Sequence, residues 1–324
     1  MTDKIFNIHT AEEFNQVALE VFKHQFKNNR VYRSFCDLLY IHPSDISKIE
    51  EIPFLPIQFF KSKKVIASLD EVDTVFTSSG TTGSITSKHY VTDVNLYKES
   101  YLKGFHHFYG DIKEYTVLAL LPNYLERNGS SLVYMVDDLI KKSNNSESGF
   151  YLNNLNEFAK KLINLDNKGQ KILLIGVSFA LLDLIEKHKF KLKNTIVMET
   201  GGMKGRRKEL IRSELHSLLK DGFGVSEIHS EYGMTELLSQ AYSKGNGVFD
   251  CPPWMKILTR DTEDALTVQE TGKTGGINVI DLANYNSCSF IATQDLGKVH
   301  KNGTFEIIGR FDNSDIRGCN LMVL

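Results

Sequence analysis

A run of hydroxyl side chains and glycines stands at Thr77-Ser-Ser-Gly-Thr-Thr-Gly83, directly after a segment that we expect to be a strand. Glycines let the backbone approach an anion closely, and hydroxyl and amide groups can donate hydrogen bonds to phosphate oxygens. The run is not a Walker A loop, because neither Lys-Ser nor Lys-Thr follows Gly83. For the run taken alone, a phosphate-binding loop and a flexible surface turn are both open.

A second turn, Glu231-Tyr-Gly-Met-Thr-Glu236, also follows an expected strand, and we expect a helix to begin at Thr235. Because the carboxyl ends of parallel strands share one edge of a sheet, the two turns can face each other across a crevice. There Glu236 could hold Mg²⁺ against phosphate oxygens, and Tyr232 could stack on a purine. Tyr-Gly before a helix is also a common turn, so this segment alone does not decide a function.

The elements that must position these turns alternate between short apolar strands and helices of about 10–15 residues, which is typical of an α/β fold with a mainly parallel sheet. We expect strands at 72–76, 115–121, 171–177, 195–198 and 225–230, and helices at 93–109, 132–141, 155–165, 179–187, 207–219 and 235–241. After about residue 250, short strands with glycine turns at 276–280, 289–293 and 304–308 predict a smaller β-rich lobe.

The first residues predict helices rather than strands. Thr10-Ala-Glu-Glu13 is a capping box, which indicates the beginning of a helix. The segment 52–60 holds two of the six prolines, so we expect an extended connector, packed through its aromatic side chains. We divide the chain into a helical segment over 1–50, an α/β core over 51–250 and the β-rich lobe over 251–324.

The composition is that of an ordinary globular protein, with 324 residues of which 41% are hydrophobic and 24% charged. The net charge of −2 gives no electrostatic reason to expect a nucleic-acid partner. The four cysteines include no Cys-x-x-Cys pair, and the first residues lack the pattern of a signal peptide. No apolar run approaches the roughly 18 residues of a membrane span. We therefore expect a cytoplasmic protein without stable membrane insertion.

Four motifs together indicate a family: Ser79-Gly-Thr-Thr-Gly83, Tyr232-Gly-Met-Thr-Glu236, Thr293-Gln-Asp295 and Gly309-Arg-Phe-Asp312. With these motifs in this order, the chain resembles the acyl-adenylate-forming enzymes over about residues 50–324. It is most similar to the branch that contains phenylacetate–CoA ligase and the LuxE-type acyl-protein synthetases. The segments that carry this closer similarity are Lys88–Val91, Leu121–Arg127, Glu199–Gly205 and Cys251–Met255.

The resemblance implies ATP and Mg²⁺ as cofactors and a role for each motif position. The loop residues Ser78, Ser79, Gly80, Thr81, Thr82 and Gly83 would wrap the ATP phosphates, with Thr81 or Thr82 near the metal. Gly201, Gly202 and Met203 would border the adenine, Tyr232 would lie against its face, and Gly233 would also contact the nucleotide. Thr235 would contact the α-phosphate, Glu236 would hold the metal, and Asp295 and Arg310 would hydrogen-bond the ribose.

The chain departs from the family pattern in two places. The usual lysine just after the glycine loop is replaced by Lys88 farther on, and a phosphate contact and a solvated surface position are both open for that side chain. The family normally carries a C-terminal lid domain beyond the Gly-Arg-x-Asp motif, and we expect this lid to be absent. The resemblance instead implies that Cys319 accepts the acyl group, with a small buried residue as the alternative. For Cys251 we favour a packing role over a metal site.

We therefore expect an enzyme that uses ATP to activate a carboxylic acid, fatty or aryl, as acyl-AMP and transfers the acyl group to a protein thiol. The acid is its substrate, and a fatty acyl reductase or carrier protein could be the accepting partner. Two alternatives stay open. The chain could be an acyl- or aryl-CoA ligase that uses a lid from another chain, or a non-catalytic subunit that binds nucleotide or acyl groups.

Overall fold

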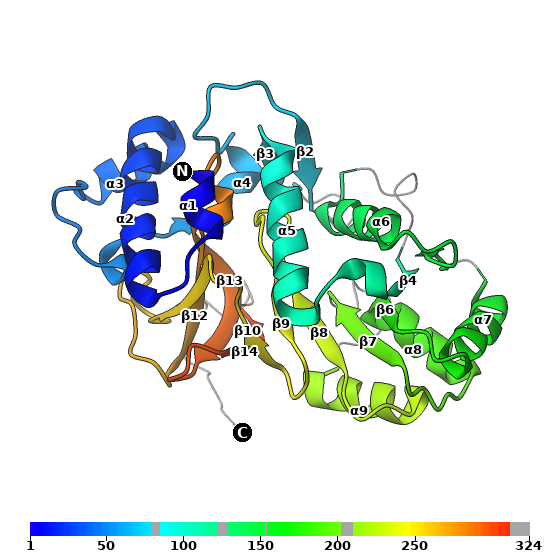
Figure 1. Ribbon diagram of the computed structural model, residues 1–324. Helices are drawn as coiled ribbons and strands as arrows, with labels where there is room; N and C mark the ends of the chain where they lie inside the picture. The colour runs from blue at the N-terminus through cyan, green and yellow to red at the C-terminus, as the bar shows by residue number, and fades with distance from the viewer. Residues whose placement is uncertain (79–84, 122–128, 153, 202–209, 312–324) are drawn as a thin grey trace.

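The computed structural model describes residues 1–78, 85–121, 129–152, 154–201 and 210–311 (Figure 1). The helices are α1 (Thr2–Phe6), α2 (Ala11–Asn28), α3 (Arg30–Leu38), α4 (Phe59–Ser62), α5 (Val94–Tyr109), α6 (Ser131–Ser143), α7 (Leu155–Asn167), α8 (Ser178–Lys187) and α9 (Arg212–Phe223), with short 3₁₀ helices η1 (Ile49–Glu51), η2 (Ile112–Glu114) and η3 (Leu282–Asn284). The strands are β1 (Leu55–Pro56), β2 (Thr74–Thr77), β3 (Lys88–Val91), β4 (Thr116–Leu120), β5 (Gly149–Phe150), β6 (Ile172–Val177), β7 (Thr195–Thr200), β8 (His229–Tyr232), β9 (Ala241–Ser243), β10 (Val248–Asp250), β11 (Met255–Arg260), β12 (Thr274–Asp281), β13 (Phe290–Val299) and β14 (Phe305–Arg310).

One large mixed sheet runs through the described residues in the order β11-β12-β13-β14-β10-β9-β8-β7-β6-β4-β5, with β1 added beside β13. The strands β5, β4, β6, β7 and β8 pair in parallel, whereas β8 to β11 along this order pair antiparallel. The strands β2 and β3 form a separate hairpin. The α/β fold class is therefore confirmed. The parallel half ends at β8, the strand that leads into the Tyr232–Glu236 motif.

The expected helix from Thr235 is wrong. After β8 the chain turns through Thr235 and Glu236 and returns as the antiparallel strand β9. The buried carboxylate of Asp281 accepts hydrogen bonds from the backbone N–H groups of Leu238 (2.7 Å) and Ser239 (3.0 Å). These N–H groups are thus satisfied by a distant side chain instead of by helical bonds. Two other expected elements begin later along the chain than we expected. The strand expected at 225–230 is β8 (His229–Tyr232), and the helix expected at 207–219 is α9 (Arg212–Phe223).

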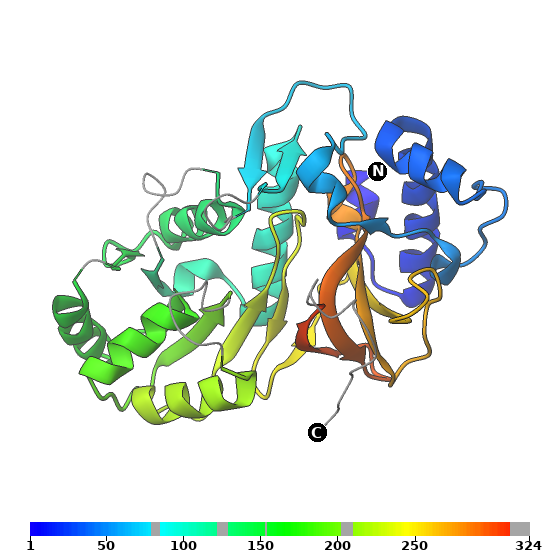
Figure 2. The same cartoon turned by 180° about the vertical axis from the view of Figure 1, so that it is seen from behind.

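The N-terminal helices pack against the antiparallel end of the sheet (Figures 1 and 2). The capping box at Thr10 and Glu13 is confirmed as the beginning of α2. From α2, the buried Gln25 donates a hydrogen bond to the Ser289 hydroxyl at 3.0 Å and accepts one from the Ser289 N–H at 2.9 Å. The strand β10, which ends at residue 250, pairs with β9 before it and with β14 near the end of the chain, so strands from both sides of residue 250 belong to one sheet. The boundaries of the three expected segments stay predictions.

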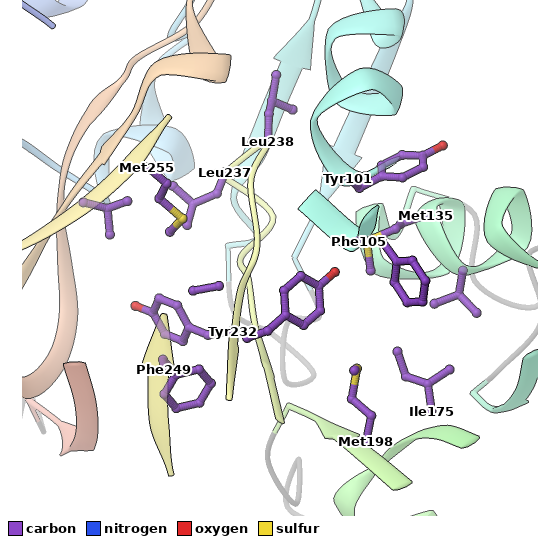
Figure 3. Close-up of a cluster of buried hydrophobic side chains, with 14 of the residues drawn as sticks. Tyr101, Phe105, Met135, Ile175, Met198, Tyr232, Leu237, Leu238, Phe249 and Met255 are labelled. Atoms are coloured by element: carbon purple, nitrogen blue, oxygen red, sulfur yellow. The ribbon is translucent and has the colours of Figure 1, made fainter. Parts of the chain in front are cut away.

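The parallel strands form an apolar core with the helices around them. Tyr101 and Phe105 of α5 face Met135 of α6, with Ile175 and Met198 of β6 and β7 below them (Figure 3). Every residue of β4 and β6 is buried, as expected for parallel strands that are covered on both faces. Among the helices that the structure describes, we find none with both the length and the apolar character needed to cross a bilayer.

Asp281 provides a test of how the turn after Glu236 is held. Replacing Asp281 by alanine leaves two buried N–H groups and the Ser239 hydroxyl, which donates to the other carboxylate oxygen at 2.6 Å, without their acceptor. We expect Asp281→Ala to lower the free energy of unfolding by about 3–5 kcal/mol, measured by urea denaturation. Asp264→Ala is the matched control, because that exposed carboxylate accepts similar bonds from Leu266 and Thr267. Equal losses in the two variants would contradict this account.

Candidate active site

A cavity of about 420 Å³ opens where β7 and β8 end. Its walls come from the end of β2, the beginning of α6, the turn after β8 and Arg310 of β14. The sheet changes from parallel to antiparallel pairing at β8, and crevices at such topological switch points are the usual ligand sites of open α/β sheets. The cavity is therefore the first candidate for the functional site.

The structure brings many of the expected site residues to this cavity. Those that line it are Ser78, Gly201, Gly233, Thr235, Glu236 and Arg310. The expected positions Ser79, Gly80, Thr81, Thr82, Gly83, Gly202, Met203 and Cys319 lie outside the described residues. The two turns that the sequence singled out thus meet at one cavity, at least through Ser78 on one side and residues 233–236 on the other.

Asp295 and Tyr232 are not among the residues that line the cavity, but Asp295 contacts Arg310, which does line it. The Arg310 guanidinium lies 3.0 Å from one Asp295 carboxylate oxygen, and the Tyr232 hydroxyl donates to the other at 2.9 Å. The Tyr232 ring packs against Phe249 (Figure 3) and Phe305, with ring centroids 5.9 and 5.6 Å away. Burial raises the pKa of the Asp295 carboxyl, and the charge of Arg310 opposes this shift. Contacts of Asp295 with a ribose and of Tyr232 with adenine stay predictions.

Glu236 is the acidic group best placed for a cation. Its side chain lines the cavity although the residue is only 6% exposed. Burial raises the pKa of the Glu236 carboxyl, while a hydrogen bond from Ser87 and the charges of Arg310 and Lys61 act in the opposite direction. A buried carboxylate is costly unless positive charge or hydrogen bonds compensate it. A cation entering the cavity would supply such compensation.

Sequence reasoning missed several residues of the cavity. Ser87 and Lys61 both line it, as do Ser130 and Ser131 at the beginning of α6. The N-terminus of a helix favours anions, because its first N–H groups lack partners within the helix. Ser87 lies close to the glycine-containing run in the sequence, but Lys61 belongs to the short helix α4 and no motif marks it. Lys88, in contrast, is exposed on β3 and does not line the cavity.

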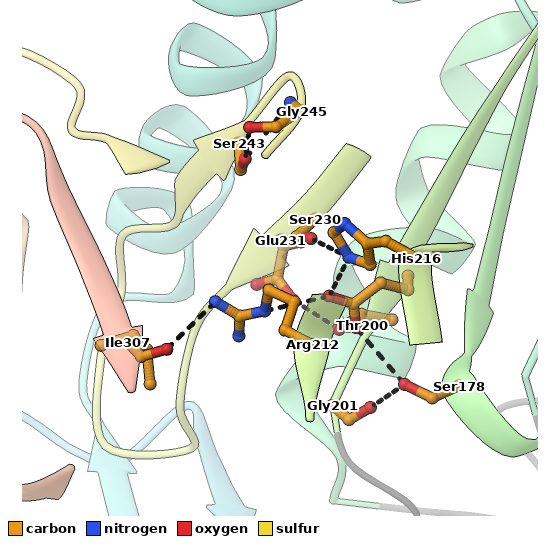
Figure 4. A network of polar contacts seen from close by, with 11 residues as sticks. Ser178, Thr200, Gly201, Arg212, His216, Ser230, Glu231, Ser243, Gly245 and Ile307 are labelled. Carbon is orange, nitrogen blue, oxygen red and sulfur yellow. Dashed lines mark hydrogen bonds and ion pairs between the residues drawn. The ribbon is translucent and has the colours of Figure 1, made fainter. Parts of the chain in front are cut away.

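A network of polar contacts holds Gly201, which lines the cavity (Figure 4). The Ser178 hydroxyl donates to the Gly201 carbonyl at 2.7 Å and lies 3.3 Å from a Glu199 carboxylate oxygen. The other Glu199 oxygen lies 3.6 Å from His216 and 3.9 Å from Arg212. Glu199 is thereby tied to α9, and the end of β7 is fixed beside the cavity.

The charges of the cavity suit an anionic ligand bound together with a cation. Lys61, Arg310, the serine hydroxyls and the α6 N-terminus can bind phosphate oxygens, and Glu236 can bind a metal ion. Within the described residues there is no group of three or more His, Cys, Asp or Glu side chains that could hold a metal by themselves. Mg²⁺ is commonly held by one or two carboxylates together with water and substrate phosphates.

Known structures show the same fold. Over 94% of this chain and 77% of the other, the structure superposes on an open conformation of 2-hydroxyisobutyryl-CoA ligase in complex with 2-HIB-AMP and CoA, with a TM-score of 0.67 and 12% identity. Over 75% of this chain it matches ATP-bound MatB from Rhodopseudomonas palustris, with a TM-score of 0.55 and 17% identity. This chain spans about half of that protein, since the match covers 49% of it.

Sequence comparison identifies the family. The chain is 25% identical to the long-chain-fatty-acid–luciferin-component ligase of Aliivibrio fischeri, over 95% of this chain and 86% of that protein. The ligase of the same name from Vibrio harveyi is 24% identical, over 93% and 84% of the two chains. The family described as "Acyl-protein synthetase, LuxE" matches residues 8–110 and 124–324. The chain therefore belongs to the LuxE family of acyl-protein synthetases, and it is an acyl-protein ligase.

Proposed function

We propose that this ligase uses ATP and Mg²⁺ to convert a carboxylic acid into an acyl-adenylate in the cavity, and then passes the acyl group to a protein cysteine. The observation that carries the proposal is the placement of Glu236, a nearly buried carboxylate on the wall of a cavity that also holds Lys61 and Arg310. Two acidic residues, Glu231 and Glu236, line the cavity beside several donors, and this arrangement fits a nucleotide triphosphate with its metal ion.

The first reaction is a displacement at the α-phosphorus of ATP. The carboxylate oxygen of the acid forms a bond to this phosphorus, and the bond from the phosphorus to pyrophosphate breaks. Glu236 would hold the metal, which would neutralise phosphate charge, and Thr235 would orient the α-phosphate. Lys61, Arg310 and the α6 N-terminus stabilise the negative charge that moves onto pyrophosphate, because preorganised donors are most effective where charge develops.

The apolar part of the cavity favours a fatty or aryl acid. Ile57, Leu132, Met135 and Met234 line it alongside the polar residues. The relatives in Aliivibrio fischeri and Vibrio harveyi are named as ligases of long-chain fatty acids. We propose a fatty acid as the substrate of this chain.

The acyl acceptor is a thiol outside the described residues. Burial raises the pKa of Cys36 and of Cys288 to about 12, and it raises the pKa of Cys251 as well. These three thiols are therefore protonated at neutral pH and are poor nucleophiles. We propose Cys319 as the first acceptor and a fatty acyl reductase or carrier protein as the partner that receives the group from it. A cytoplasmic location would keep such thiols reduced.

Glu236→Gln tests the metal site. The substitution keeps the size of the side chain but removes the negative charge that holds the cation. We expect ATP–pyrophosphate exchange, measured with a panel of carboxylic acids, to fall at least about 100-fold. Circular dichroism and the unfolding temperature of the variant should stay near those of the wild type. Exchange at the wild-type rate would remove Glu236 from the mechanism.

Lys61→Met tests the phosphate contact that the sequence did not reveal. Lys61 lines the cavity and Lys88 does not, so Lys88→Met is a matched control on a neighbouring segment. We expect Lys61→Met to raise the KM for ATP and to slow exchange about tenfold or more, with Lys88→Met close to the wild type. The reverse result would show that Lys88 supplies the phosphate-binding cation.

Cys319→Ser tests the acceptor. Incubation with ATP, Mg²⁺ and a radiolabelled fatty acid should label the wild type as a thioester that hydroxylamine cleaves. Cys319→Ser should keep pyrophosphate exchange and lose the label, whereas Cys251→Ser should keep both. A label that survives in Cys319→Ser would place the acceptor elsewhere. Turnover with coenzyme A at a rate comparable to that of protein acylation would favour the alternative function of an acyl-CoA ligase.

A further inference from the structure

Two consecutive backbone carbonyls of the turn after β8 are held by side chains from other parts of the chain. The His89 ring, on β3, has Nδ1 2.9 Å from the Thr235 carbonyl oxygen. The Asn284 amide, at the end of η3, donates to the Glu236 carbonyl oxygen at 2.7 Å. Because a carbonyl oxygen only accepts, the His89 Nδ1 atom must carry the proton.

These two contacts decide which way the turn faces. His89 and Asn284 are both fully buried, so water cannot replace either donor without a change in structure. With its carbonyls directed toward β3 and η3, the turn keeps Thr235 and Glu236 on the cavity wall. The orientation of the two proposed catalytic side chains therefore depends on His89 and Asn284.

The side chains of His89 and Asn284 also interact with each other, so the two donors form one buried unit. Burial lowers the pKa of His89 to about 4, so the ring carries one proton at neutral pH, and this proton is on Nδ1, where it faces the Thr235 carbonyl.

We propose that His89 and Asn284 are positioning residues that fix Thr235 and Glu236 for adenylation. The inference rests on the proposed function, since it assigns these residues to the same site. They contact neither substrate nor metal themselves. Their effect passes through the backbone of the turn, where a displacement of about 1 Å can slow a reaction on the order of 100-fold.

The geometry can be tested without any activity. In protein labelled with ¹⁵N-histidine, the NMR signals of His89 should show a proton on Nδ1 and none on Nε2 from pH 6 to 8. A high-resolution crystal structure should show His89 Nδ1 and the Asn284 amide nitrogen within hydrogen-bond distance of the Thr235 and Glu236 carbonyl oxygens. A proton on Nε2, or the loss of either contact with the turn, would overturn the proposed arrangement.

The functional test compares two substitutions of the same residue. In His89→Asn, the introduced side-chain amide can still donate at the place of Nδ1, whereas the side chain introduced by His89→Leu is of similar size and cannot donate. We expect His89→Leu to lower kcat for pyrophosphate exchange on the order of 100-fold and to raise the Mg²⁺ concentration for half-maximal exchange. It should also reduce the rise in unfolding temperature that ATP with Mg²⁺ produces. For His89→Asn, we expect kcat, the Mg²⁺ dependence and the rise in unfolding temperature to stay much closer to the wild-type values than for His89→Leu.

Phe158→Leu controls for stability, because this buried core residue of α7 does not line the cavity. It should lower the unfolding temperature without changing kcat or the Mg²⁺ dependence. If His89→Leu behaves like Phe158→Leu, the positioning role is wrong while the proposed function stands. If the wild type shows no exchange with any acid, the proposed function fails, and the NMR and crystallographic results still decide the arrangement around His89.

Discussion

The carboxylate of Glu236 lies almost out of water on the wall of the cavity, and the rest of the site is arranged around this charge. A buried carboxylate is unfavourable without compensation, and here the compensation comes from Ser87, Arg310 and Lys61. Ser87 lies just before β3, Arg310 is in β14 and Lys61 is in α4, so distant parts of the chain must fold together to form the site. The same balance explains why a cation is a suitable ligand: it supplies the positive charge that the protein provides only in part.

The change from parallel to antiparallel pairing at β8 makes this arrangement possible. Gly201 and the Tyr232–Glu236 motif lie at the ends of the parallel strands β7 and β8. Asp295 and Arg310 lie on the antiparallel strands β13 and β14, and Arg310 lines the same cavity. The connection between β12 and β13 adds Asn284 to the turn. The antiparallel half is therefore part of the active site, and the N-terminal helices that pack on it through Gln25 stabilise the site indirectly.

Much of this could be predicted from the sequence, because strands, helices and motifs are encoded by local patterns. The alternation of elements and the meeting of the two turns followed from such patterns. The helix at Thr235 was wrong because Asp281, a residue far along the chain, accepts the N–H bonds that a helix would use. Lys61 and His89 were missed for the same reason: their roles arise from contacts that only the folded chain creates.

The central claim is that the acid is activated by attack of its carboxylate on the α-phosphorus of ATP, and isotope transfer tests this step most directly. With a fatty acid that carries ¹⁸O in its carboxyl group, transfer of the acyl group to a thiol breaks the carbon–oxygen bond of the adenylate. The account predicts that the released AMP contains one ¹⁸O atom and that pyrophosphate contains none, as measured by mass spectrometry. Formation of ADP with ¹⁸O-labelled phosphate would instead indicate an acyl phosphate and would contradict the account.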